Sequence, residues 1–179
     1  MPSKPGSTAV LAGLVLALGA ALLPGTARAQ QFDPAQVEAG MRIYKPNVGD
    51  CEQCHAWNGA GRSHDTMYSH IVAGGPSLVA STMTRAQMIE IVSCGTIHWW
   101  GVMPQYRNDA WTPQLRCYGK TRAEQPSDER PLLGPTQLTP AQIEAVVTYV
   151  QVVYQGKRMT LDYCRQYFGP NSQACDLLK

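Results

Sequence analysis

The sequence predicts an all-α fold in which short helices are separated by long irregular loops. Four segments carry helix start or stop signals, and three of them place apolar residues on one face. No segment alternates apolar and polar residues as a half-buried strand does, and no internal repeat is evident. Proline is frequent between residues 96 and 138, which predicts irregular structure in that region.

The first predicted helix begins at Pro34, because Asp33 is a suitable N-cap and proline is favoured at the first helical position. Pro46 ends it. Its apolar face has three members: Val37, Met41 and Tyr44. After it, residues 56–81 are rich in glycine, serine and histidine, which predicts an extended loop.

The second predicted helix covers residues 84–94. Thr84 and Gln87 have the spacing of a capping box, and Gly95 marks the end of the helix. One face of this segment is apolar and comprises Met88, Ile91 and Val92.

The third predicted helix begins after Thr139, and its apolar pattern is the clearest in the chain. Its apolar residues repeat at spacings of three and four: Ile143, Val146, Val147, Val150 and Tyr154. We expect this helix to pack on the first one. A short last helix is predicted for residues 160–168, ending at Gly169 and Pro170.

The amino terminus has the features of a secretory signal peptide. Lys4 precedes an apolar run over residues 9–23, and Ala27-Arg28-Ala29 forms a cleavage site before Gln30. A membrane anchor is the alternative, but this run of about 15 residues is shorter than the roughly 20 needed to cross a bilayer. We therefore expect residues 1–29 to be removed on export to the periplasm, leaving a chain with no membrane span.

The mature chain is expected to form one domain over residues 30–156, with a C-terminal extension at residues 157–179 packed on it. Removal of Lys4 and Arg28 with the leader would leave 13 basic and 13 acidic residues. This balance argues against nucleic-acid binding, which requires clustered basic residues.

Cys51-Glu52-Gln53-Cys54-His55 is the most informative motif of the chain, because C-x-x-C-H is the attachment signature for c-type haem. Each thiol can form a thioether to one porphyrin, and the adjacent histidine can bind its iron. Redox or zinc C-x-x-C sites are the alternatives, but zinc needs further Cys or His ligands at metal spacing, which this sequence lacks. One covalently bound haem c is therefore predicted.

Four cysteines remain: Cys94, Cys117, Cys164 and Cys175. In an oxidising compartment they allow three disulfide pairings. Pairing of neighbours in sequence, Cys94 with Cys117 and Cys164 with Cys175, is favoured because each bond would close an irregular loop. Four buried free thiols are the alternative.

The order of these features resembles that of class I cytochromes c over about residues 32–155. A helix is followed by C-x-x-C-H, a wrapping loop, a middle helix, a methionine loop and a final helix. Gly75-Pro76-Ser77-Leu78 is similar to the G-P-x-L segment of that family. The resemblance implies a class I cytochrome c fold with helices around one haem. It also implies that the carbonyl of Pro76 accepts a hydrogen bond from His55 and orients it.

The same resemblance implies that Met103, in Gly101-Val102-Met103-Pro104, is the second iron ligand. A His/Met pair favours electron transfer, since sulfur raises the potential and a full coordination sphere excludes substrate. The other methionines are interpreted as core residues: Met41, Met67, Met83, Met88 and Met159. His98 is the alternative ligand and would lower the potential. The bulky segment Ile97 to Trp100 departs from the family pattern, which usually has a glycine-rich turn there.

Other residues near the predicted site have less specific roles. His64 and His70 are expected at the surface or beside the haem propionates. Four aromatic residues flank the methionine: Trp99, Trp100, Tyr106 and Trp111. Two or three of them are expected to form a hydrophobic lid over the haem, and an exposed tryptophan at the haem edge is the alternative as a partner contact.

Further short motifs over residues 84–178 are similar to periplasmic cytochromes c that accept electrons from PQQ-dependent alcohol dehydrogenases, especially the lanthanide-dependent methanol dehydrogenases. They are Ile91-Val92-Ser93-Cys94-Gly95, Met103-Pro104, Arg116-Cys117-Tyr118-Gly119, Tyr163-Cys164, Phe168-Gly169 and Ala174-Cys175. This similarity implies a non-enzymatic carrier that takes single electrons from such a quinoprotein. The acceptor would be a cytochrome or a terminal oxidase.

Two other functions are compatible with the sequence. The chain is a candidate haem subunit of a larger respiratory or dehydrogenase complex, with the tail after residue 156 and the insert at residues 117–135 as docking surfaces. An open-site haem enzyme or gas sensor is the third candidate, and it requires that Met103 does not bind the iron.

Overall fold

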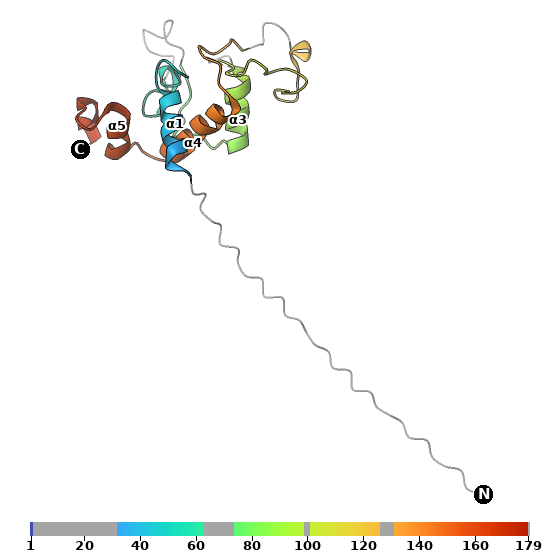
Figure 1. The fold of residues 1–179 in the computed structure, drawn as a ribbon, viewed down its shortest axis with the longest axis horizontal. Coiled ribbons are helices and arrows are strands. Elements are labelled where there is room, and N and C mark those ends of the chain that lie inside the picture. The colour runs from blue at the N-terminus through green and yellow to red at the C-terminus, as the bar shows by residue number, and fades with distance from the viewer. Residues whose placement is uncertain (2–31, 63–73, 99–100, 126–130, 179) are drawn as a thin grey trace. The chain divides into compact units, whose positions relative to one another are not determined.

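The computed structural model describes Met1 and residues 32–62, 74–98, 101–125 and 131–178 (Figure 1). The side chains of residues 97, 98, 101 and 102 are not described. Five of the residues singled out above lie outside the described ranges: His64, Met67, His70, Trp99 and Trp100. The expected signal peptide, apart from Met1, also lies outside them. Residues 31–179 form one structural unit, and the description below concerns that unit alone.

The described chain is mostly helical, in agreement with the predicted all-α class. The principal helices are α1 (Pro34–Tyr44), α3 (Arg85–Cys94), α4 (Pro140–Tyr149) and α5 (Leu161–Phe168). Each is preceded by a residue whose side chain accepts a hydrogen bond from the first helical turn: Asp33, Thr84, Thr139 and Thr160. All four predicted helices are therefore confirmed.

Several short elements were not predicted. α2 (Glu52–His55) is a single helical turn inside the C-x-x-C-H motif. The others are the 3₁₀ helices η1 (Arg122–Glu124) and η4 (Gln173–Leu178). The π-helix η3 (Val150–Tyr154) continues α4 and covers the end of the third predicted helix.

The prediction that the chain has no strands was wrong for one segment. β1 (Thr96–His98) and β2 (Gly101–Met103) form an antiparallel pair in the region that was expected to be irregular. Thr96 pairs with Met103 at the open end of this hairpin, and His98 pairs with Gly101 at its turn. Strands of three residues are too short to show an alternating pattern in the sequence.

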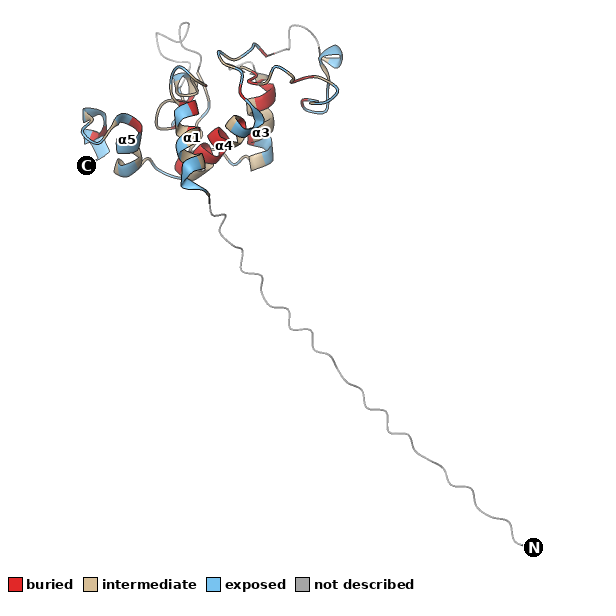
Figure 2. Ribbon diagram, viewed as in Figure 1, coloured by how far each residue is buried: buried red, intermediate tan, exposed pale blue. Residues whose placement is uncertain are grey.

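α1 packs against α4, as predicted, and the two helices cross at Gly40. A Cβ atom at this position would lie 2.1 Å from the carbonyl oxygen of Ala145 and 2.6 Å from Cβ of Tyr149. The absence of a side chain therefore sets the distance between the helices. α4 is buried over most of its length (Figure 2).

Three buried tyrosines connect this helix pair to the chain around the C-x-x-C-H motif. The hydroxyl of Tyr44 donates to the carbonyl oxygen of Ala56 at 2.7 Å, and that of Tyr154 donates to Trp57 at 2.6 Å. The hydroxyls of Tyr149 and Tyr154 lie 2.9 Å apart. Because Tyr154 already donates to Trp57, Tyr149 is the donor in that pair.

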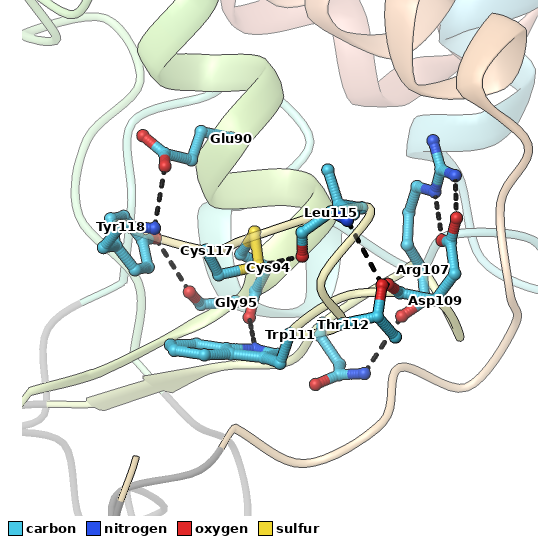
Figure 3. The surroundings of a disulfide bond; sticks show 11 residues. Glu90, Cys94, Gly95, Arg107, Asp109, Trp111, Thr112, Leu115, Cys117 and Tyr118 are labelled. Atoms are coloured by element: carbon cyan, nitrogen blue, oxygen red, sulfur yellow. Dashed lines mark hydrogen bonds and ion pairs between the residues drawn. A yellow bond between two sulfur atoms is a disulfide. The ribbon is translucent and has the colours of Figure 1, made fainter. Parts of the chain in front are cut away.

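Both favoured disulfide pairings are present. Cys94 is bonded to Cys117, with a Cα–Cα distance of 5.7 Å, and Cys164 to Cys175, with 5.8 Å. Figure 3 shows the first bond beside the end of α3. The second joins α5 to η4.

The C-terminal segment contacts the region of α1 and α2 through Tyr167. Its hydroxyl donates to the carboxylate of Glu52, and its carbonyl oxygen accepts a hydrogen bond from Lys45. The rings of Tyr167 and Trp57 have centroids 6.2 Å apart. Among the helices of the described ranges, none is both long and apolar enough to cross a bilayer.

Candidate haem site

A cavity of about 340 Å³ lies among α1, α2, α3, the β-hairpin and α4. Its volume is within the range of roughly 300–1,000 Å³ that is typical of small-molecule and cofactor sites. Most of its walls are apolar, with Val146, Val147 and Val150 on one side of the lining. All five residues predicted for the site also line it: Cys51, Cys54, His55, Pro76 and Met103.

Cys51 is the N-cap of α2, and Cys54 lies within this helix. Neither cysteine forms a disulfide bond. Burial, and then the charge of Asp50, raise the pKa of Cys51 to about 12. The same two causes raise the pKa of Cys54, while Arg62 acts in the opposite direction. Both residues are therefore thiols at neutral pH. Redox-active C-x-x-C motifs depend instead on a thiol of lowered pKa, so this environment argues against that alternative.

His55 has a defined tautomer. Its Nδ1 atom lies 2.8 Å from the carbonyl oxygen of Pro76, so Nδ1 carries the proton and Nε2 has a free lone pair. Burial lowers the pKa of His55, and the hydrogen bond to Pro76 only partly opposes this. The imidazole is therefore neutral near pH 7, as a metal ligand must be. This is the hydrogen bond that the family resemblance implied.

Close backbone packing holds Pro76 beside α2. A Cβ atom on Gly75 would lie 2.8 Å from the carbonyl oxygen of Cys54. Gly61 has a φ of 84°, and a Cβ atom there would lie 2.7 Å from the carbonyl oxygen of Gly75. Two glycines therefore let the Gly75-Pro76 segment approach the motif closely enough to accept the proton of His55.

Met103 reaches the cavity from the last position of β2. The backbone of His98 lies in β1, but its side chain is outside the described part of the structure, so the choice between the two ligands stays a prediction. Met88 belongs to the core, as predicted, and also lines the cavity from α3. The place of Met88 in the cavity wall was not predicted, because the spacing of apolar residues along a helix does not distinguish a core face from a cavity wall.

Two of the aromatic residues expected near Met103 are described, and they differ in position. Tyr106 lines the cavity, and its hydroxyl donates to the carbonyl oxygen of Gly49 at 2.6 Å. Trp111 is not among the lining residues and packs in a second small core with Cys94 and Cys117. Of these two residues, Tyr106 therefore fits the expected lid and Trp111 does not.

The charged groups of the cavity were not predicted. Asp50 and Arg62 line it beside the motif cysteines, and no other Asp, Glu, Lys or Arg is present among the described lining residues. A basic side chain at the edge of an apolar cavity can bind a carboxylate of a ligand. No motif in the sequence indicated that Asp50 and Arg62 would line a cavity.

The residues present are chemically suited to a haem. Apolar walls suit a porphyrin, two neighbouring thiols can form thioethers, and a neutral histidine with a free Nε2 and a methionine thioether are both iron ligands. Within the described residues, no cluster of three or more His, Cys, Asp or Glu side chains could hold a metal ion without a cofactor.

Comparison of this chain with protein-family models, curated proteins and solved structures gave no match.

Proposed function

We propose that this protein is an exported monohaem c-type cytochrome that carries single electrons. Cys51 and Cys54 would hold the haem through thioether bonds, with His55 and Met103 as iron ligands. The haem would supply a one-electron couple between ferric and ferrous iron. The protein would supply attachment, ligand orientation and exclusion of water, so no residue is assigned a catalytic role.

One observation carries this proposal. The free thiols of the motif, the oriented His55 and the thioether of Met103 all line the same apolar cavity. These residues come from separate segments of the chain, and a core built only for stability does not require this donor set.

Haem attachment is tested by expressing the full chain in a bacterium that matures c-type cytochromes. The exported protein should retain haem through denaturing electrophoresis and give the pyridine haemochrome spectrum of a thioether-linked haem. The Cys51→Ala/Cys54→Ala double variant should lose covalent haem, whereas Cys164→Ala/Cys175→Ala should keep it. Equal haem retention by the first variant and the unmodified protein would contradict the proposal.

We further propose, from the sequence resemblance, that a PQQ-dependent alcohol or methanol dehydrogenase is the electron donor and a cytochrome or terminal oxidase the acceptor. The encounter would be transient, with an interface at the small end of the usual range, below about 1,200 Å². Substrate-reduced PQQ methanol dehydrogenase, mixed with the oxidised protein in a stopped-flow instrument, should reduce the haem rapidly and saturably. Reduction no faster than that of an unrelated small cytochrome would exclude this donor.

A permanent place in a larger complex is the second candidate, and one observation favours it. Leu132 and Leu133 in the insert are 72% and 63% exposed. Their neighbour Pro135 lines the cavity wall, and the N–H of Gly134 donates to the carbonyl oxygen of Gln105. Purification from the native membrane and soluble fractions distinguishes the two candidates, because only the second predicts a stoichiometric partner.

A further inference from the structure

Two aromatic side chains donate hydrogen bonds to carbonyl groups at the end of α3 (Figure 3). The indole Nε1 of Trp111 donates to the carbonyl oxygen of Cys94 at 3.0 Å. The hydroxyl of Tyr118 donates to the carbonyl oxygen of Gly95 at 2.8 Å. The last carbonyl groups of a helix have no partner within the helix, and here two side chains from a distant loop provide one.

The same loop has two more connections to α3. The disulfide bond joins Cys117 to Cys94, and the backbone N–H of Tyr118 donates to the carboxylate of Glu90 at 2.9 Å. Burial, with the charge of Glu90, raises the pKa of Tyr118 to about 12, so its hydroxyl stays a donor at neutral pH. The rings of Trp111 and Tyr118 also pack together, with centroids 5.9 Å apart.

The backbone of both aromatic residues is in the left-handed region. Trp111 has a φ of 66° and Tyr118 a φ of 52°. This region is uncommon for bulky residues and persists only where the surrounding contacts determine it. At both positions the side chain makes a hydrogen bond to the end of α3, to Cys94 from Trp111 and to Gly95 from Tyr118.

The end of α3 is also the base of the hairpin that carries Met103. Gly95 directly precedes β1, and Thr96 pairs with Met103. A Cβ atom on Gly95 would lie 2.6 Å from the carbonyl oxygen of Met103 and 2.7 Å from the backbone nitrogen of Gln105. With the backbones in such close contact, a displacement of Gly95 must displace β2.

We propose that Trp111 and Tyr118 are positioning residues for Met103: by holding the carbonyl groups of Cys94 and Gly95, they fix the base of the hairpin and keep the thioether in the cavity. This inference rests on the proposed function, in which Met103 binds the iron. A purely stabilising role for the two residues predicts a different result, because their loss would then lower overall stability without altering the sixth ligand.

The test uses Tyr118→Phe, which removes only the hydroxyl. Carbon monoxide competes with Met103 for ferrous iron, so its association rate reports the fraction of protein in which the thioether is detached. The loss of one intramolecular hydrogen bond should raise that rate roughly two- to tenfold. The methionine-to-ferric-iron charge-transfer band should weaken in parallel, while far-UV circular dichroism shows the same folded fraction.

Tyr149→Phe is the matched control. It also removes one tyrosine hydroxyl with a hydrogen-bond partner, Tyr154, but Tyr149 is not among the residues that line the cavity. Its variant should lose stability without a change in the carbon monoxide rate. Equal rates in Tyr118→Phe and Tyr149→Phe would overturn the role of Tyr118.

Trp111→Phe provides a second, independent variant. It keeps an aromatic ring in the small core and removes the donor to Cys94, so it should change the same two signals in the same direction. An effect in only one variant would restrict the role to that residue, and no effect in either would end the inference. Failure of the proposed function is recognised separately, because the unmodified protein would then lack the charge-transfer band.

Discussion

His55 and Pro76 are joined by a hydrogen bond between the ring Nδ1 and the carbonyl oxygen, 2.8 Å long and spanning 21 positions of the sequence. The bond fixes one nitrogen of the imidazole as a donor and leaves the other as the available ligand. It depends on Gly75, where a Cβ atom would lie 2.8 Å from the carbonyl oxygen of Cys54. The orientation of the proposed iron ligand is therefore determined by the absence of a side chain in the adjacent segment.

On the proposed function, Gly75→Ala should raise the midpoint potential of the bound haem. The added methyl group must displace the Gly75-Pro76 segment from α2, which weakens the bond to His55. A less basic imidazole stabilises ferric iron less, so reduction becomes easier. Overpacking at this contact should also lower the free energy of unfolding by about 1–3 kcal/mol. Redox titration and denaturant unfolding measure the two effects.

Pro76→Ala is the control for that experiment, because alanine keeps the carbonyl group that accepts the hydrogen bond. It should shift the potential less than Gly75→Ala does. A larger shift in Pro76→Ala would mean that the ring of the proline, rather than its carbonyl oxygen, controls the site.

Met103→Ala should lower the potential, abolish the methionine-to-iron charge-transfer band and open ferrous iron to carbon monoxide. The reason is the loss of a sulfur ligand that favours ferrous iron, and axial ligation alone changes haem potentials over roughly 0.8 V. Absorption spectroscopy and redox titration measure the change. Two comparison variants follow from the structure and the sequence: Met88→Ala, because Met88 also lines the cavity, and His98→Ala. Persistence of the band in Met103→Ala and its loss in Met88→Ala would assign the ligand to α3.

The helices could be predicted because their signals are local. Thr84 with Gln87 and Thr139 with Gln142 form capping boxes within four residues of sequence, and both are present in the structure. The disulfide pairing could also be favoured from proximity in sequence. Such features depend on neighbouring residues, which a single sequence displays directly.

The rest depends on contacts between distant segments. The hairpin base is held by Gly95 packing on Met103, and Trp111 joins the small core around a disulfide rather than the cavity. Neither relationship has a local signal in the sequence. An aromatic residue near Met103 looks the same in the sequence whether it lines the cavity or packs against the disulfide. The same holds for Arg62, whose place at the cavity follows from the fold.

The two disulfides should contribute similarly to stability and differently to the site. The bonded cysteines are 23 and 11 residues apart in the sequence. The chain-entropy model predicts that each bond adds about 3 kcal/mol to the free energy of unfolding. Cys94→Ala/Cys117→Ala should lower the unfolding free energy and weaken the charge-transfer band, because this bond lies at the hairpin base. Cys164→Ala/Cys175→Ala should lower only the unfolding free energy. Denaturant unfolding with absorption detection measures both, and a weakened band in the second variant alone would contradict the expected division.

Gly40→Ala should destabilise the protein even though alanine favours helices more than glycine does. Propensity alone predicts a gain of roughly 0.5–1 kcal/mol inside a helix. The new Cβ atom, however, would lie 2.1 Å from the carbonyl oxygen of Ala145, so α1 and α4 must separate. Overpacking of this kind costs about 1–3 kcal/mol or more, and the net change should be a loss of unfolding free energy, measured with denaturant.

Separation of these helices should also reach the cavity, because Tyr44 lines it from α1, and Val146 and Val147 line it from α4. Gly40→Ala should therefore increase the exposure of the proposed haem to solvent, which redox titration and the carbon monoxide rate detect. Gln36→Ala, a change near the start of the same helix, is the control and should alter stability by less than about 0.5 kcal/mol. If Gly40→Ala were as stable as Gln36→Ala, the close approach of α1 and α4 at Gly40 would not be needed for the stability of the protein.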